Sequence, residues 1–328
     1  MTEQTQSFSS SSPLDGLKND TDLQLFDVHV HYHSKHFAKE FQEAFKTYNI
    51  SNVMAITGPK VKKFLEDNQL IENVTFCYFL SALAFTRYKT KDLVEQVHEA
   101  KELGFKAIKI FFGPRLWQVS RRNEYYKIQD ERLHDIYTAI EEEGFPVIIH
   151  VADPDIWYEK KYTNTQKYGT KNDRLTDFEE LLKMFPNINW ISAHFGCLPE
   201  NLPKLSSTLD SYPNMFIDTG STKWMIRELG KNIEETREFV KKYQERILWG
   251  SDIANRANFS MLYSRKNREK YWYSRFWSQR MFWETPYEAD LAFTDSDNPT
   301  GTRIHGLNLP KEILQKIYFH NAQKVLNA

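Results

Sequence analysis

Residues 27–33 read DVHVHYH and close the first of a series of short apolar runs. A doubly wound open sheet usually places a glycine-rich phosphate-binding turn directly after its first strand. This stretch contains no glycine, so it argues against that fold. His29 and His31 stand there instead, and on an extended strand two residues so spaced point to the same face.

Seven further runs of apolar or β-branched residues follow along the chain, and their composition is typical of buried parallel strands. The eight runs are Leu23–Val30, Asn52–Thr57, Val74–Ala82, Phe105–Phe112, Pro146–Val151, Asn189–His194, Met215–Asp218 and Ile247–Trp249. Helical apolar spacing between them predicts helices at 90–103, 129–143, 175–185, 233–245 and from Pro310 onward. Eight strands that alternate with helices predict an α/β protein with the (β/α)8 TIM-barrel fold.

The domain organisation follows from where polar and apolar segments lie. The polar, serine-rich residues 1–21 are expected to form a disordered tail, and residues 22–328 a single barrel domain. Three connections that follow strands, 113–128, 152–171 and 253–308, are unusually long. In a barrel, such connections build the face that carries the active site, so they predict the walls and lid of a pocket.

Composition excludes several classes of partner. The 328 residues include 43 Lys and Arg against 44 Asp and Glu, and the resulting net charge of −1 gives no general attraction to nucleic acid. No stretch approaches the roughly 20 apolar residues that cross a bilayer, and the tail lacks the basic start and apolar core of a secretory signal. Cys77 and Cys197 are too few for a disulfide framework or an all-cysteine zinc site. We therefore expect a cytoplasmic protein that acts on a small molecule and binds neither nucleic acid nor membrane.

Other candidate ligands stand at the ends of later strands. His150 closes the fifth run, His194 closes the sixth, and Asp252 follows the eighth. Because the carboxyl ends of barrel strands meet at one face, these side chains and the His29–His31 pair form a candidate metal centre. Neutral imidazoles with one carboxylate favour Zn²⁺, with Mn²⁺ or Fe²⁺ as alternatives, over Ca²⁺ or Mg²⁺.

With these residues the sequence resembles the amidohydrolase superfamily, most closely the branch of aminocarboxymuconate semialdehyde decarboxylase and related metal-dependent hydrolases. The resemblance covers residues 22–328 and rests on HVH at 29–31, His150, His194 and WGSD at 249–252. It implies that one divalent ion is held by His29, His31, His150 and Asp252. It also implies a catalytic or ligand-supporting role for His194.

Some members of this superfamily hold two metal ions through a carboxylated lysine at the end of the fourth strand. Lys109 lies in the corresponding strand, but Phe111, Phe112 and Gly113 follow it. This places Lys109 deeper in the barrel than the strand end, so we expect one ion.

Three functions are compatible with these residues. The first is metal-dependent hydrolysis of a small, acidic amide, lactone or ester, in which Asp252 accepts a proton from water and His194 stabilises the oxyanion or transfers a proton. The second, implied by the branch, is nonoxidative decarboxylation of an unsaturated or aromatic carboxylic acid. The third is a metal-binding scaffold without catalysis. We expect hydrolysis first and decarboxylation as its alternative.

Candidate substrate contacts follow from loop position alone. They are Arg115, Trp117, Trp157, Ser221, Trp224 and Arg256, with Asp153 beside them. An arginine at such a rim can bind a substrate carboxylate through two hydrogen bonds. The aromatic run YWYSRFWSQRMFW at 271–283 covers much of a helix circumference. It suits a lid helix at the barrel mouth or an interface in a homo-oligomer.

Overall fold

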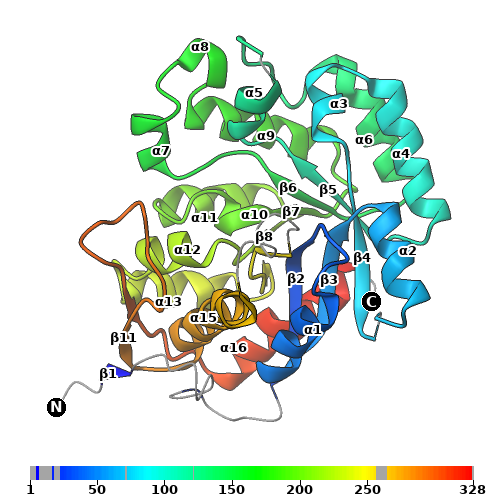
Figure 1. Ribbon diagram of the computed structural model, residues 1–328. Coiled ribbons are helices and arrows are strands. Elements are labelled where there is room, and N and C mark those ends of the chain that lie inside the picture. Colours follow the sequence, from blue (N-terminus) through cyan, green and yellow to red (C-terminus); the bar gives the residue numbers. More distant parts are fainter. Residues whose placement is uncertain are drawn as a thin grey trace. The chain divides into compact units, whose positions relative to one another are not determined.

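The computed structural model describes residues 5–6, 17, 23–70, 72–120, 122–255 and 264–326. The chain divides into two compact units, the first comprising Met1–Thr75 and Asp218–Ala328 and the second Phe76–Ile217. Strands and helices alternate along both units, which confirms the predicted α/β class (Figure 1). Most of the tail predicted at 1–21 lies outside the described residues.

The strand that carries the histidine pair is central to the first unit. β2 (Leu25–Tyr32) pairs in parallel with β3 (Ile50–Thr57) and with β10 (Ile253–Asn255). Seven of its eight side chains are buried, as expected for a strand in a parallel sheet. The other strands of the unit are β9 (Ile247–Leu248) and, in a small separate sheet, β1 (Thr5–Gln6), β11 (Glu288–Asp290) and β12 (Arg303–His305).

Local capping chemistry sets the helix ends of the first unit. Asn232 begins α13 by accepting the backbone N–H of Glu235, and acidic residues in the first turn and lysines in the last complement the helix dipole. Pro310 precedes the C-terminal helix as its cap. The helices are α1 (Ala38–Thr47), α2 (Pro59–Asp67), α12 (Thr222–Leu229), α13 (Ile233–Lys242), α15 (Arg265–Glu284), α16 (Lys311–Gln315), the π-helical turn η2 (Lys316–His320) and α17 (Asn321–Leu326).

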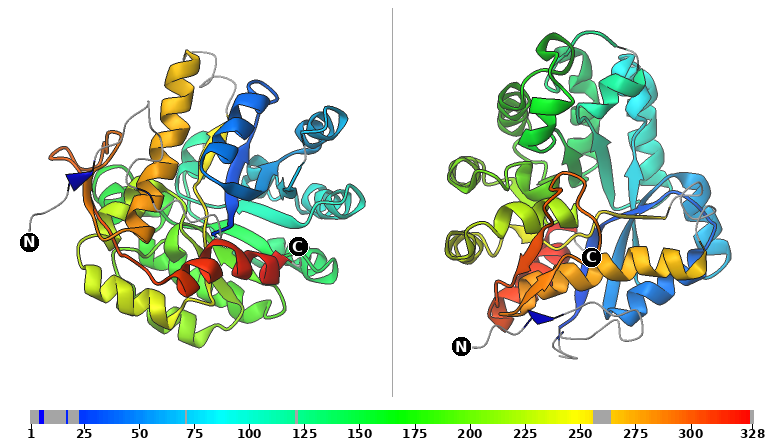
Figure 2. Two further views of the ribbon diagram at one scale, coloured as in Figure 1. Left: turned by 90° about the horizontal axis from the view of Figure 1, so that it is seen from below. Right: turned by 60° about the vertical axis from the view of Figure 1, so that its left-hand side comes forward.

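Helix α15 contains the aromatic run and confirms that this run is helical. It begins after Ser264, whose hydroxyl accepts the Asn267 N–H, and every side chain from Phe276 to Glu284 is buried. Arg268 forms a bidentate ion pair with Glu40 of α1, and Figure 2 shows α15 lying along α1. Its predicted role as a lid or a subunit interface stays a prediction.

In the second unit five strands pair in parallel and in chain order, each with the next. The strands are β4 (Val74–Phe79, which crosses into this unit at Phe76), β5 (Ala107–Phe111), β6 (Val147–His150), β7 (Trp190–Ser192) and β8 (Met215–Asp218). The helices are α3 (Ala82–Thr86), α4 (Thr90–Glu102), α5 (Arg115–Ser120), η1 (Glu131–Leu133), α6 (His134–Glu142), α7 (Asp155–Lys160), α8 (Thr165–Tyr168), α9 (Lys171–Met184), α10 (Ala193–Gly196) and α11 (Leu202–Ser211). Gly104 and Gly144 end α4 and α6 with φ of 73° and 71°, a conformation that glycine adopts without strain.

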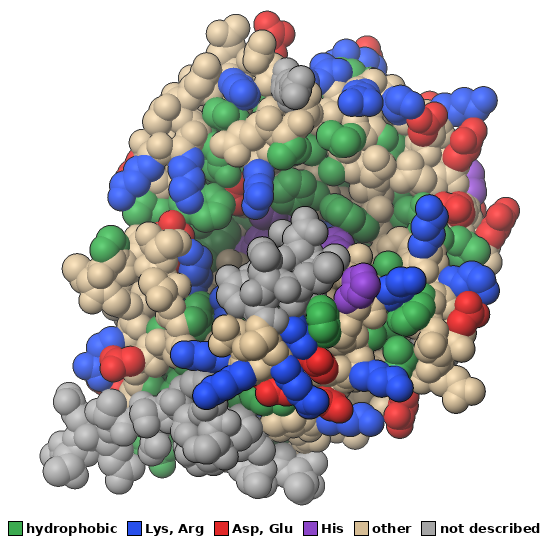
Figure 3. All heavy atoms as spheres, viewed as in Figure 1, with side chains coloured by type: hydrophobic (Ala, Val, Ile, Leu, Met, Phe, Trp, Pro, Cys, Tyr) green, Lys and Arg blue, Asp and Glu red, His purple; other side chains and the backbone are tan. Residues whose placement is uncertain are grey.

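Each of the eight predicted runs contains a strand, and several strands, including the one in the sixth run, are shorter than predicted. β7 ends at Ser192, so His194 lies in the turn that follows. Among the described residues, no helix combines the length and apolar character of a membrane span. Acidic and basic side chains are interspersed over the face drawn in Figure 3.

Candidate metal centre

In the first unit, β2 brings two imidazoles to one side of the strand. His29 and His31 alternate with Val28 and Val30, and both valines are fully buried in the core. His29 is itself 0% exposed, whereas His31 is partly exposed. The apolar neighbours fix the strand, so the two rings project toward the same point.

The turn before β10 delivers a carboxylate to these rings. The N–H of Asp252 donates to the carbonyl of His29 at 2.8 Å, and Asp252 adopts a φ of 55°, the left-handed region that is unusual for a side-chain-bearing residue. Oδ1 of Asp27 accepts both the Ser251 N–H at 2.9 Å and the His29 N–H at 3.1 Å. A methyl group on Gly250 would stand 2.8 Å from the Cβ of His29, so this close approach requires glycine.

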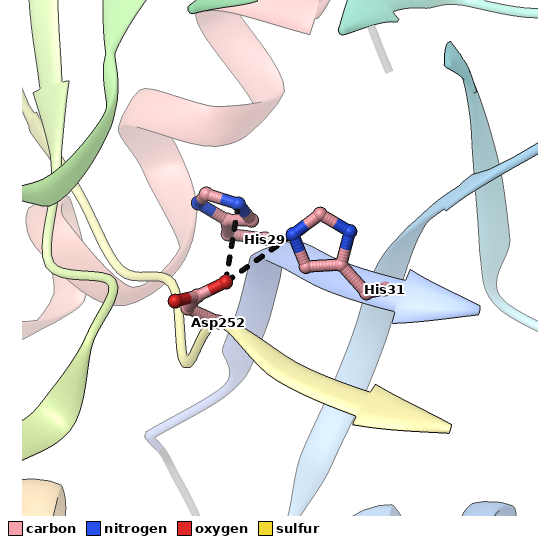
Figure 4. Close-up of side chains that lie close together, drawn as sticks. All are labelled: His29, His31 and Asp252. Carbon is pink, nitrogen blue, oxygen red and sulfur yellow. Dashed lines mark ion pairs between the residues drawn. The ribbon is translucent and has the colours of Figure 1, made fainter. Parts of the chain in front are cut away.

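The three side chains meet at one carboxylate oxygen, as Figure 4 shows. Oδ1 of Asp252 lies 3.5 Å from Nε2 of His29 and 3.2 Å from Nε2 of His31. One ligand atom from each of the three residues lies within 4.8 Å of the other two. Two imidazole nitrogens and a carboxylate are a donor set that suits Zn²⁺, Mn²⁺ or Fe²⁺, so these residues fit the ion that the sequence predicts.

Asp218 supports this set, although no prediction from the sequence included it. Its Oδ2 lies 2.8 Å from Nδ1 of His29, and both side chains are buried. A carboxylate on Nδ1 holds the proton there and leaves Nε2 as the electron-pair donor. Asp218 is the last residue of a predicted strand, so a carboxylate at that strand end was the signal available in the sequence.

Burial changes the charge states of the centre. It lowers the pKa of His31 to about 3, with the neighbouring Asp252 opposing this shift, so His31 is neutral at physiological pH. Burial likewise raises the pKa of Asp27 to about 7, against the N–H groups of Ser251 and His29 that favour its charged form. A neutral imidazole is the form that binds a metal ion.

The second unit carries titratable residues of its own. Nε2 of His150 lies 3.1 Å from Oδ1 of Asp153, and Nδ1 of His150 lies 3.2 Å from Nε2 of His194. The two rings meet edge to face with centroids 4.5 Å apart. Burial raises the pKa of Asp153, but the hydrogen bond and charge of His150 outweigh burial, and the net pKa is lowered. The structure therefore joins His150, His194 and Asp153, and Asp153 orients His150.

His194 stands on strained backbone. His194, Phe195, Gly196 and Cys197 have φ of 59°, 55°, 65° and 58° in succession, so α10 contains a left-handed turn. For each residue other than glycine this conformation costs about 1–2 kcal/mol. Strain of this kind concentrates at functional sites, which supports a role for His194 beyond packing.

Lys109 lies on β5 with its side chain 1% exposed. In the β5–β6 pairing, Lys109 stands opposite Ile148, whereas Phe111 stands opposite His150. The lysine is thus two residues, about 6.6 Å along a strand, below the level of His150. This register agrees with the expectation that Lys109 lies too deep to bridge two ions.

Two of the predicted substrate contacts are packed in the interior. Trp117 is 0% exposed, and its indole N–H donates to the carbonyl of Glu124 at 2.9 Å. Trp224 is 3% exposed on α12. Contact with a substrate would require either side chain to become exposed, and such contact stays a prediction.

The other predicted contacts are more accessible. Arg115 is exposed at the start of α5, and Trp157 is half-buried beneath the ammonium of Lys161. Ser221 is half-buried before α12, with a φ of 66°. Arg256 lies outside the described residues. Contacts of these residues with substrate remain predictions.

Comparison with known proteins shows the family of the chain and solved structures with a similar fold. A family model described as Amidohydrolase matches residues 81–328. No curated protein matches the chain.

Three solved structures align with nearly the whole chain. A TIM-barrel protein from Bordetella bronchiseptica is 14% identical, with a TM-score of 0.54, over 93% of this chain and 99% of that one. The 5-carboxyvanillate decarboxylase of Sphingomonas paucimobilis is 11% identical, with a TM-score of 0.51, over 93% and 99%. The 5-carboxyvanillate decarboxylase of Novosphingobium aromaticivorans, in complex with manganese and 4-hydroxy-3-methoxy-5-nitrobenzoic acid, is 10% identical, with a TM-score of 0.53, over 95% and 98%. At these identities the likeness concerns the fold, and it confirms the predicted TIM-barrel class.

Proposed function

Because the chain belongs to the amidohydrolase family, we propose that it is a metal-dependent decarboxylase that releases CO₂ from an aromatic or unsaturated carboxylic acid. The observation that carries the proposal is that the Nε2 atoms of His29 and His31 both lie close to Oδ1 of Asp252. Two of the compared structures are decarboxylases, and one of them binds manganese, which supports decarboxylation over hydrolysis. Hydrolysis, the first hypothesis from the sequence, stays the alternative.

The residues of the first unit would hold the ion. His29, His31 and Asp252 offer the donor atoms, and Asp218 keeps the Nε2 electron pair of His29 available. When bound, a divalent ion such as Zn²⁺ or Mn²⁺ would orient the acidic substrate and neutralise part of its charge. The family resemblance supports His150 as a further ligand, and that assignment stays a proposal.

The reaction needs one proton delivered to carbon. The proton adds to the carbon that bears the carboxylate, the bond to the carboxylate then breaks, and its electron pair restores the unsaturated system as CO₂ leaves. We assign the proton transfer to His194, because imidazole is a common general acid and base and the backbone of this residue is held in a strained conformation. Asp252, the second catalytic residue expected from the sequence, would accept a proton from water in the hydrolytic alternative.

The test is to assay the metal-loaded protein for CO₂ release from a panel of hydroxybenzoic and unsaturated carboxylic acids. A parallel panel of lactones, amides and esters tests hydrolysis. Release of CO₂ from at least one acid supports the proposal. Hydrolysis with no CO₂ would favour the alternative, and inactivity with retained metal would leave the scaffold hypothesis.

Variants connect the activity to the centre. His29→Ala and His31→Ala are expected to lose both metal and activity. His98→Ala is the matched control, because His98 is 49% exposed and pairs with Glu143 on the surface. Elemental mass spectrometry of the protein purified without chelator gives the stoichiometry. About one equivalent supports a mononuclear centre, and about two would bring Lys109 back into consideration.

A further inference from the structure

Helix α15 carries four arginines, and three of them have carboxylate partners. Arg265 pairs with Glu43 and Glu269, Arg268 with Glu40, and Arg280 with Glu284. Arg275 is the exception: it forms no ion pair with any residue that the structure describes. Its guanidinium therefore has no carboxylate in direct contact among the described residues.

The guanidinium of Arg275 is nevertheless held in one orientation. Its Cζ lies 3.7 Å from the centre of the Tyr271 ring and 4.2 Å from the centre of the Phe293 ring. Nη1 donates to the carbonyl of Tyr271 at 2.9 Å. Nε and Nη2 have no partner among the described residues. The N–H groups on this side of the guanidinium are therefore available to donate hydrogen bonds to another molecule.

The same face of α15 reaches the turn that carries Asp252. One turn after Arg275, Nε2 of Gln279 donates to the carbonyl of Gly250 at 3.2 Å and to the hydroxyl of Thr222 at 3.0 Å. Residues four apart on a helix are neighbours on one face, so Arg275 lies on the side that packs against this turn. The charge of Asp252 acts on Arg275 as well: burial lowers the pKa of the arginine, while Tyr271 and Asp252 oppose that shift.

We infer that Arg275 binds the anionic group of the substrate and selects for carboxylic acids over neutral analogues. The inference rests on the proposed function, because it takes the substrate to be a carboxylic acid. A rigid guanidinium with two open donors matches a carboxylate through two parallel hydrogen bonds. Asp252 acts electrostatically on Arg275, and the cation would offset the repulsion between that carboxylate and an anionic substrate. Arg275 thus adds a specificity residue from the insertion at 253–308, where the sequence suggested only a lid or an interface.

The experiment measures the binding of salicylate and its neutral analogue salicylamide to the metal-loaded protein by titration calorimetry. Wild-type protein is expected to prefer salicylate. Arg275→Gln should weaken salicylate binding about 10- to 100-fold, as loss of a charge-assisted pair predicts, and should leave salicylamide binding unchanged. Arg275→Lys keeps the charge but loses the planar fork, so an intermediate affinity is expected.

Arg265→Gln is the matched control on the same helix, because Arg265 is an exposed residue paired with Glu43 and Glu269. Metal content and melting temperature of each variant show whether it is folded and loaded. The role of Arg275 is overturned if loaded Arg275→Gln binds salicylate as wild type does, or if wild type binds both compounds equally. Failure of the proposed decarboxylase function would give a different result. No acid would release CO₂, but the protein would still prefer salicylate, and this preference would still depend on Arg275.

Discussion

Nδ1 of His29 lies 2.8 Å from Oδ2 of Asp218, and both side chains are removed from solvent. The second oxygen of the same carboxylate accepts the Gly220 N–H at 2.8 Å. Asp218 is therefore held on one side by the backbone and presents its other oxygen to the imidazole. The pair fixes which nitrogen of His29 can bind an ion.

Asp218→Asn is expected to weaken metal binding about 10- to 100-fold, because an amide holds the His29 proton less firmly than a carboxylate does. Metal affinity, measured by competition with a chromogenic chelator, checks this prediction. Asp67→Asn is the control, since Asp67 is an exposed partner of Lys63. Equal affinities of wild type and Asp218→Asn would contradict the orienting role.

Gly250→Ala should disturb the metal centre through sterics alone. The added methyl group would stand 2.8 Å from the Cβ of His29, and relief of that contact must move β2 or the turn before Asp252. We expect a loss of about 1–3 kcal/mol in the free energy of unfolding, together with weaker metal binding. Urea denaturation measures the free energy of unfolding, and competition with a chelator measures the metal affinity.

A matched glycine tests this explanation. A methyl group on Gly58 would meet no atom within 4 Å, so Gly58→Ala should change stability by less than about 1 kcal/mol. Similar losses in both alanine variants would mean that crowding against His29 is not the cause.

Arg174 is expected to stabilise the second unit. It is 1% exposed, and its guanidinium donates to the carbonyls of Tyr168 at 2.7 Å, Phe112 at 2.8 Å and Val151 at 3.3 Å. Arg174→Met leaves these buried acceptors without their donors, and we expect it to lower the free energy of unfolding by at least about 2 kcal/mol. Arg87→Met, at an exposed position, should stay within about 0.5 kcal/mol in the same urea titration.

The connection between β11 and β12 should be sensitive to acid. Burial raises the pKa of Asp295, but hydrogen bonds from Arg227 and Thr302 outweigh it, and the net pKa is lowered. A carboxyl whose pKa is lower in the folded state stabilises the fold above its unfolded pKa of about 3.9, and that stabilisation disappears as the pH falls through the folded value.

Asp295→Asn should therefore be less stable than wild type near neutral pH, and the difference should shrink as the pH falls below about 4. Urea denaturation of both proteins over a pH series measures this difference. A difference that is constant over the whole series would show that the charge of Asp295 contributes nothing to stability.

Strand content and the histidine pair were predictable from short segments. The period of a strand places His29 and His31 on one face, and continuous apolar runs mark the eight strands, because these properties depend on neighbouring residues alone. The sequence also placed Asp252 beside the pair, since it follows a strand end. It missed Asp218, whose partner is 189 residues away. It also placed His194 at a strand end, where the structure has a left-handed turn.

The sequence by itself determined the α/β class, the family, the positions of the strands and the donor atoms available at their ends. Local periodicity and side-chain chemistry are sufficient for these properties. Tertiary structure alone decided that Asp218 orients His29, that Gly250 must be glycine, and that Arg275 contacts two aromatic rings on the face of α15 that reaches Gly250. These relationships join segments far apart in the chain, and their geometry depends on strand register and helix packing that no local pattern encodes.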